Sequence, residues 1–334
     1  MTALSQVAPS LALAGAVAVA ASDPDAGVAW HFGDPFAEQR AWHGGRGVAD
    51  LSYRAVLRIP GSDRLRWLHD LTTQHLTQLP AHQATETLLL DPRGHVEDQL
   101  LGVDDGTAFW MHVEPGRAAP LLDFLTRMRF MLDVDVVDLS SQRVVVALGA
   151  DVEIPAWLAG DPQLVVRRCD TALPWRGTEL LVLRPDAQRL VADGERPVGS
   201  WALEAERVAA RRPRLGLETD HRTIPNEVGW LDTAVHLDKG CYRGQETVAK
   251  VHNLGRPPRR LVLLHLDGPQ VLPAPGSDVL LGERAVGFLG RVAHHFELGP
   301  IALALVKRGV SDDAVLTVTD SDGEQVAASI DPGT

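Results

Sequence analysis

The sequence predicts an α+β protein that ends in a small β-barrel. The first part of the chain follows the order strand, helix, strand, strand, helix, strand, which is the split βαβ pattern. A looser copy of this order follows it. From Arg260 onward the pattern changes to short strands separated by Gly, Pro or Asp turns, at the spacing of a small barrel or sandwich.

The first half, about residues 48–140, is predicted from apolar runs and the residues that end them. A strand stops at Pro60-Gly61, and the turn residues Asp91-Pro92-Arg93-Gly94 separate two further strands as a hairpin. The predicted elements are a strand at 55–59, a helix capped by Ser62 or Asp63, strands at 87–90 and 96–103, a helix at 120–131 and a strand at 134–137.

The second half, about residues 141–255, repeats this order less regularly. Together the halves predict a domain over 25–255 that contains two ferredoxin-like units. An N-terminal tail over 1–24 precedes this domain, and the residues from 22 to 48 are loop-like. Arg256-Pro257-Pro258-Arg259 is a hinge to the barrel, 256–334. The remaining predicted strands are 144–148, 164–168 and 179–183, then 260–266, 278–281, 284–293, 301–307, 313–318 and 324–329, with a helix within 196–212.

Composition excludes several classes of function. The net charge of -12 argues against general nucleic-acid binding, and two cysteines, Cys169 and Cys241, do not make a disulfide framework. A cytoplasmic location is therefore expected. The apolar run 11–21 is too short to span a bilayer and follows no Lys or Arg, so we expect a frayed tail or a first packed strand there. The 13 histidines lack metal-ligand spacing, and no metal site is predicted.

The most informative segment is the octapeptide from Lys239 to Glu246, which reads Lys-Gly-Cys-Tyr-Arg-Gly-Gln-Glu. The cations Lys239 and Arg243 flank Cys241 and favour its thiolate over its thiol. Gly240 and Gly244 allow backbone angles that other residues avoid, so the loop could bring the thiol close to a ligand. Tyr242 lies between them, and Gln245 and Glu246 suit a helix start. The alternative is a small buried cysteine in a tight turn.

This octapeptide closely resembles the signature of the YgfZ family of folate-binding proteins. That family is related to the T-protein, the aminomethyltransferase of the glycine cleavage system, and its mitochondrial relatives are iron–sulfur cluster assembly factors. Weaker similarities cover roughly residues 25–330. The resemblance implies tetrahydrofolate or a derivative as cofactor, bound in a cleft between the two halves, and Cys241 as the reactive group.

Four further residues are candidate folate contacts. Asp98 matches the acidic residue that faces the reacting nitrogens in T-proteins, and Arg207 matches a folate-contacting arginine. Arg211 shares a helix face with Arg207 at i, i+4 spacing, which suits a carboxylate tail. Trp201, on the same helix, could stack on the pterin. The alternatives are a solvated or capping acid, a solvated basic face and a core tryptophan.

Three departures from T-proteins weigh against aminomethyl transfer. The Tyr-Thr-Gly-Glu block is absent around 175–179, Gln99 replaces a second hairpin acid, and T-proteins have no cysteine at the position of Cys241. The resemblance therefore implies an accessory protein in the synthesis or repair of iron–sulfur proteins, rather than a classical turnover enzyme. The thiolate could ligate iron, exchange with a persulfide or accept a one-carbon unit. The alternatives are a folate-dependent aminomethyl- or methyltransferase of one-carbon metabolism, and a folate-sensing module without chemistry.

Overall fold

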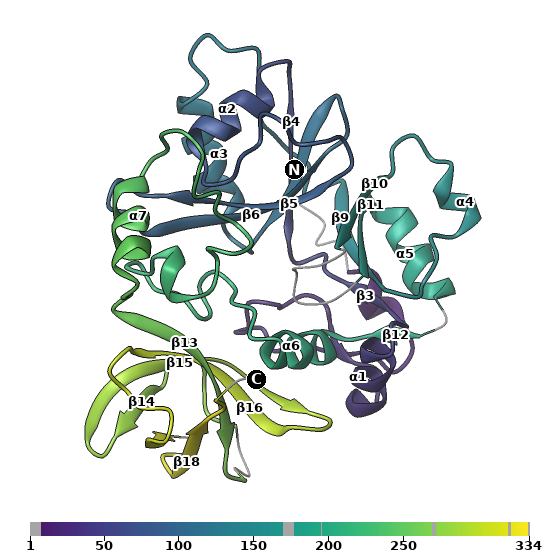
Figure 1. Cartoon of the computed structure of the whole chain (residues 1–334). Coiled ribbons are helices and arrows are strands. Elements are labelled where there is room, and N and C mark those ends of the chain that lie inside the picture. The colour runs from purple at the N-terminus through teal and green to yellow at the C-terminus, as the bar shows by residue number, and fades with distance from the viewer. Residues whose placement is uncertain (1–7, 170–176, 195, 269–271, 320–321, 333–334) are drawn as a thin grey trace. The chain divides into compact units, whose positions relative to one another are not determined.

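The computed structural model describes residues 8–169, 177–194, 196–268, 272–319 and 322–332 (Figure 1). Two five-stranded sheets with helices and a closed C-terminal barrel confirm the predicted fold class. The chain divides into two compact units. The first contains Met1–His69, Leu76–Glu86 and Leu100–Leu203, and the second contains Asp70–His75, Thr87–Gln99 and Glu204–Thr334.

Short helices and strands alternate along the chain before the barrel. In chain order they begin with a 3-10 turn Pro9–Ala12, β1 Val17–Ala18, β2 Ala29–His31, α1 Pro35–His43, β3 Val48–Asp50, β4 Ala55–Pro60, α2 Arg64–Leu71, β5 Ala84–Leu90, β6 Val96–Asp104, β7 Ala108–Val113, α3 Ala118–Arg127 and β8 Val137–Asp138. Next come β9 Arg143–Gly149, α4 Ala156–Ala159, β10 Val165–Cys169, β11 Gly177–Leu183, α5 Arg184–Asp193, β12 Pro197–Val198, α6 Ser200–Ala209, a 3-10 turn Pro225–Glu227 and α7 Gln245–Leu254.

One five-stranded sheet has the order β5-β6-β7-β4-β8. It contains the predicted hairpin and one strand, β7, that the sequence pattern does not predict. Every residue of β7 is buried, so it lacks the alternation of a half-exposed strand. The helix expected over 120–131 ends at Arg127, and Phe130 has a left-handed φ of 47° that a helix cannot hold.

The second sheet has the order β10-β11-β9-β3-β12, with β12 parallel to β3. Alternate side chains of β9 serve two cores. Val145 and Ala147 pack with buried residues of β4 and β7, whereas Val144, Val146 and Leu148 pack with Leu190 of α5. Burial on both faces explains why all seven residues of β9 are buried rather than alternating with exposed ones.

The segment before β3 is more ordered than the expected loop. The side chain of Asp34 accepts a hydrogen bond from Ala37 N at 2.9 Å and caps α1, with Pro35 in the first turn. Ser10 N donates to Asp50 Oδ2 at 2.8 Å, which ties the described part of the tail to β3. Residues 1–7 of the expected tail lie outside the described residues.

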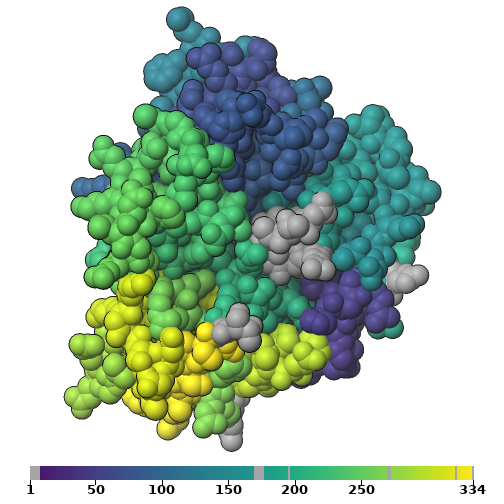
Figure 2. Space-filling view, viewed as in Figure 1, coloured from purple at the N-terminus to yellow at the C-terminus, as the bar shows by residue number. Residues whose placement is uncertain are grey.

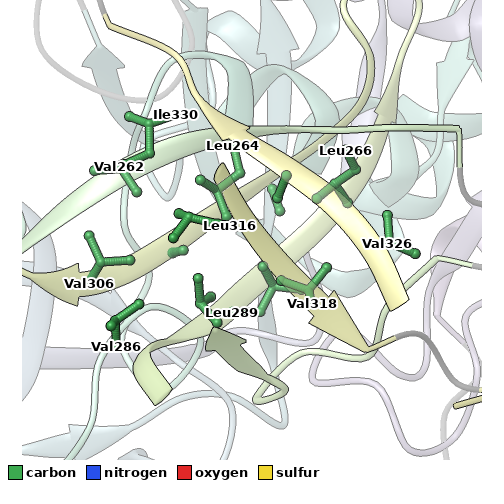
Figure 3. Packing of buried hydrophobic residues seen from close by; sticks show 14 of the residues in the cluster. Val262, Leu264, Leu266, Val286, Leu289, Val306, Leu316, Val318, Val326 and Ile330 are labelled. Carbon is green, nitrogen blue, oxygen red and sulfur yellow. The ribbon is translucent and has the colours of Figure 1, made fainter. Parts of the chain in front are cut away.

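The C-terminal strands form a closed barrel in the order β13-β16-β15-β14-β17-β18. They are β13 Arg259–Leu266, β14 Asp278–Leu281, β15 Arg284–His295, β16 Gly299–Lys307, β17 Val315–Thr319 and β18 Gln325–Ile330. Figure 2 shows their surface in yellow-green and yellow. Period-2 alternation directs Leu316 and Val318 inward from β17, where they meet Val326 and Ile330 of β18 (Figure 3). The predicted strand positions all correspond to observed strands.

Candidate functional site

The signature loop is anchored by Lys239, within the second unit. Its Nζ donates hydrogen bonds to the carbonyl oxygens of Thr72 at 2.6 Å and Gln74 at 3.1 Å. The ammonium also lies 5.1 Å from the ring centroid of Tyr242. Lys239 and Tyr242 are both buried, so two side chains next to Cys241 hold the loop against the chain.

Burial changes the proton affinity of both anchors. Desolvation lowers the pKa of Lys239 to about 8, opposed by the negative charge of Asp70. Burial raises the pKa of Tyr242 to about 12. Lys239 is thus committed to backbone carbonyls, a role that its position beside Cys241 in the sequence does not reveal.

Gly244 is the second anchor of the loop. Its φ is 82°, and it forms the N-cap of α7, so Gln245 and Glu246 begin a helix as predicted. A Cβ at Gly244 would lie 2.6 Å from the carbonyl oxygen of Asp91 and 2.8 Å from Gly94 Cα. The loop therefore packs directly on the β5–β6 turn, and this close approach requires glycine.

The β5–β6 turn is itself rigid. Asp91 accepts hydrogen bonds from the backbone N–H groups of Arg93 and His95, each at 2.8 Å. Gly94 has a φ of 85°, and a Cβ there would lie 2.7 Å from Thr247 Cβ of α7. The turn and the cysteine loop thus fit together through two glycines.

Cys241 itself is exposed, which excludes the alternative of a buried structural cysteine. Arg243 Nη1 pairs with Glu97 Oε2 at 3.0 Å on the same hairpin. Gly240 differs from Gly244, because its φ lies outside the left-handed range and a Cβ there would meet no atom of the described residues within 4 Å. The arrangement presents an accessible thiol on a loop with fixed ends. The side chain of Cys169 lies outside the described part of the chain.

Asp98 lies in β6 and is buried, as is Gln99. Asp98 is four residues beyond Gly94, which corresponds to about 13 Å along an extended strand. The hairpin therefore carries the contact for the cysteine loop at its turn and a buried carboxylate further along the same strand.

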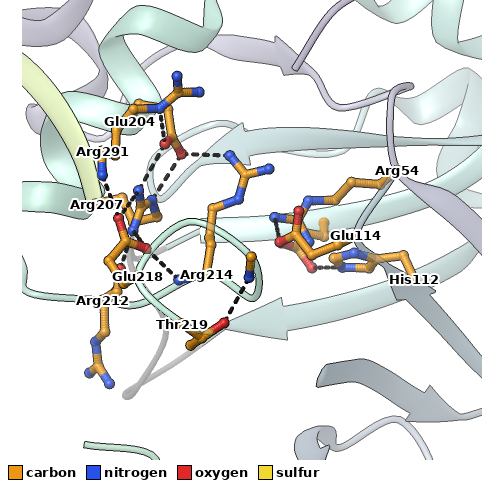
Figure 4. Close-up of polar contacts among 12 residues, drawn as sticks. Arg54, His112, Glu114, Glu204, Arg207, Arg212, Arg214, Glu218, Thr219 and Arg291 are labelled. Carbon is orange, nitrogen blue, oxygen red and sulfur yellow. Dashed lines mark hydrogen bonds and ion pairs between the residues drawn. The ribbon is translucent and has the colours of Figure 1, made fainter. Parts of the chain in front are cut away.

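Arg207 lies in a buried cluster of charges in the second unit (Figure 4). Its guanidinium bonds to both carboxylate oxygens of Glu204, both of Glu218 and the carbonyl oxygen of Arg212. These bonds use all five N–H donors of an arginine. Arg207 therefore has no donor left for a ligand in this arrangement, so folate binding would depend on other residues.

The same cluster includes Arg214 and Arg291, which bond to Glu204 at 3.0 and 2.8 Å. Burial alone would raise the pKa of Glu204, but the three arginine charges hold it well below its usual range. The Glu204–Arg207 spacing is visible in the sequence, but no sequence signal marks Glu218, which follows Arg207 after 11 residues, or Arg291, which lies in β15.

The remaining two candidates have partners in the structure. Arg211 lies beyond the end of α6 with a left-handed φ of 55°, so the predicted helix face shared with Arg207 is wrong. Arg211 is partly exposed and pairs with Asp331. Trp201 stacks on Trp30 with ring centroids 5.5 Å apart and also contacts the rings of His31 and Phe36. Trp201 thus belongs to an aromatic cluster in the first unit, whereas Arg211 belongs to the second unit.

A buried network in the first unit was not identified from the sequence. Glu179 Oε2 lies 2.9 Å from His112 Nε2 and 2.6 Å from Arg167 Nη1. Burial alone would raise the pKa of Glu179. The charges of Arg167 and His112 outweigh this effect and hold the pKa well below its usual range. Burial lowers the pKa of His112. Each residue stands on a different strand, so only the folded sheets bring them together.

Neither a cluster of metal-ligating side chains nor a membrane-spanning helix is found among the described residues. No group of three or more of their His, Cys, Asp or Glu side chains is arranged to hold a metal ion. Among the same residues, no helix combines the length and apolar character needed to cross a bilayer.

Comparisons with known proteins point to aminomethyltransferases. No family model matches the chain. A protein of Arabidopsis thaliana named "putative transferase, chloroplastic" is 27% identical over 290 residues, which cover 78% of this chain and 66% of that protein. The aminomethyltransferase of Thermus thermophilus is 27% identical over 316 residues, 86% of each chain. That of Synechococcus sp. strain WH7803 is 27% identical over 274 residues, 72% of this chain and 73% of that protein.

The fold agrees with these similarities. The crystal structure of glycine cleavage system aminomethyltransferase T from Bartonella henselae superposes with a TM-score of 0.79 and 19% identity, over 95% of this chain and 93% of that one. The homologues of the chain are therefore aminomethyltransferases and related proteins, and its fold is theirs. None of these names specifies the YgfZ family, and the chloroplastic relative leaves the cytoplasmic location a prediction.

Proposed function

We propose that the chain binds tetrahydrofolate or a derivative, and that it supports the synthesis or repair of iron–sulfur proteins through Cys241. The observation that carries this proposal is the exposed thiol on a loop with fixed ends. Lys239 fixes one end of the loop on backbone carbonyls, and Gly244 fixes the other on the β5–β6 turn. A thiol without a chemical role would not need to be held exposed in this way.

Two candidate residues of the second unit, Asp98 and Arg211, fit a reduced folate. Resemblance to the T-protein implies this cofactor, which would supply a carrier for one-carbon units. A pterin offers N–H donors, and the buried carboxylate of Asp98 is an acceptor for them. Arg211 is accessible enough to reach a carboxylate tail by exchanging its contact with Asp331. Asp98 would orient the ring system, and Arg211 would bind the tail.

The second candidate is a folate-dependent aminomethyl- or methyltransferase. The names of the relatives favour it, because most of those compared are aminomethyltransferases. An assay of aminomethyl transfer to tetrahydrofolate from a loaded carrier protein separates the two candidates. Turnover that is unaffected by Cys241→Ser would favour the transferase.

The direct test of the first candidate is deletion of the gene in its host, followed by activity assays of iron–sulfur enzymes. We expect reduced activities that the wild-type gene restores and Cys241→Ser does not. Gly240→Ala is the matched control, because an added Cβ there meets no described atom within 4 Å. Full restoration by Cys241→Ser would rule out a role of the thiol.

A further inference from the structure

A cavity lies wholly within the first unit, whereas the cysteine loop belongs to the second unit. It has a volume of about 570 Å³, within the range of small-molecule sites. Three segments enclose it: the residues leading into β3, the loop from β9 to α4, and the end of α5 with the start of β12. The helices α4 and α5, which contribute Trp157 and Leu190 to the lining, are teal in Figure 1.

The floor of this cavity is apolar. Val48, Leu148 and Leu190 belong to the core beneath α5, and Val152 and Trp157 pack against it. The guanidinium of Arg189 lies 4.1 Å from the ring centroid of Trp157 and fixes the orientation of the indole. The cavity therefore offers a preformed surface for an apolar body.

The rim of the cavity carries two arginines at one edge of the sheet. Val48 of β3 pairs with Pro197 of β12 in parallel, so Arg46 and Arg196 both precede their strands at the same end. Neighbouring strands lie about 4.8 Å apart, which allows two guanidinium groups to bind one carboxylate. Within the described part of the chain, neither side chain has a hydrogen bond or ion pair, and both are exposed.

Two carboxylates line the cavity from the loop after β9. Asp151 and Glu153 are exposed, and neither carboxylate has a hydrogen bond or ion pair among the residues that the structure describes. The acids and the arginines of the rim thus do not neutralise each other, although they line one cavity. A ligand with one group of each sign would pair with both sets.

We propose that this cavity binds a small zwitterion with an apolar body, the class of apolar amino acids and short apolar peptides. The ligand carboxylate pairs with Arg46 and Arg196, its ammonium with Asp151 and Glu153, and its side chains lie on Leu190 and Trp157. This binding is separate from the function proposed for Cys241.

The test is titration calorimetry of the full chain with leucyl-leucine, leucine and phenylalanine. We expect saturable binding of at least one. Its N-acetyl derivative lacks the ammonium and its amide lacks the carboxylate, and each should bind at least about tenfold more weakly. Arg196→Gln and Asp151→Asn should weaken binding by a similar factor. Arg66→Gln, an exposed arginine of α2 outside the cavity, and Cys241→Ser should leave it unchanged.

The proposal is overturned if none of the three probes binds at millimolar concentration. It is also overturned if Arg196→Gln, confirmed as folded by circular dichroism, binds as well as wild type. Equal binding of the N-acetyl derivative would show an anion site and contradict the zwitterion.

Discussion

Gly244 is the residue on which the position of the cysteine loop most directly depends. Gly244→Ala should lower the free energy of unfolding by at least about 1 kcal/mol, because its φ of 82° is strained for alanine and the new Cβ meets the backbone of Asp91. Gly240→Ala is the control and should change it little. Urea unfolding of both variants measures the difference, and equal stability of the two would contradict the fixed end of the loop.

The buried amine of Lys239 makes the free energy of unfolding depend on pH. Below pH 8 the amine is charged in both the folded and the unfolded chain. Between about 8 and its ordinary value of 10.5, the unfolded chain binds more protons, so stability rises with pH. The gain should be about 2–3 kcal/mol relative to Lys239→Met.

Above pH 10 the raised pKa of Tyr242 has the opposite effect on stability, because the unfolded chain loses the phenol proton at a lower pH than the folded chain does.

Denaturant unfolding of wild type and Lys239→Met across pH 7 to 10 measures this gain in stability. The difference between the two free energies of unfolding at each pH cancels the titration of the groups that both proteins share. Parallel pH profiles for the two proteins would show that Lys239 is not desolvated in the folded chain. With the measurement extended above pH 10, Tyr242→Phe should lack the decline that wild type shows there and should keep the earlier rise.

At the scale of elements, α6 depends on Arg207. Arg207→Ala should lower the free energy of unfolding by about 3–5 kcal/mol, because Glu204 and Glu218 would lose their main charge partner while buried. Arg211→Ala, four residues later and partly exposed, is the control, with an expected loss below about 1 kcal/mol. Chemical denaturation compares them. A loss at Arg207 as small as that at Arg211 would contradict the assigned role.

The elements also show what the sequence could predict. Barrel strands were found because turn residues separate them and their burial alternates, as in β18. The pattern does not predict β7, because this strand is buried on both faces. It does not predict α1 either, because the loop-like residues before 48 include Asp34-Pro35, a pair that also starts helices. Local pattern therefore identified most elements and failed where burial removed the pattern or where one dipeptide suits two structures.

The site was predictable only in part, for a related reason. The octapeptide identified Cys241 and the helix start, because its residues act through local geometry. Lys239 binds backbone carbonyls, which no side-chain type in the sequence indicates. The partners of Arg207 include Glu218, whose spacing from Arg207 matches no helical pattern. Contacts between distant segments appear only in the folded chain.

At the scale of the whole molecule, reduced folate should stabilise the chain. Tetrahydrofolate at about 100 times its dissociation constant should add about 2.7 kcal/mol, and polyglutamyl forms should add more. Arg211→Ala should remove the advantage of the polyglutamyl forms, whereas Arg222→Ala, an exposed arginine of the same unit, should retain it. Thermal unfolding measures each shift. No response of wild type to millimolar tetrahydrofolate would end the cofactor proposal.

The central claim is that Cys241 and folate act at one site. Alkylation of Cys241, measured with and without saturating tetrahydrofolate, tests it most directly, with Cys241→Ser giving the background from Cys169. We predict alkylation several-fold slower with folate bound, because the ligand shields the thiol or orders its loop. Equal rates with and without folate, in a protein whose folate binding is confirmed by calorimetry, would contradict the claim.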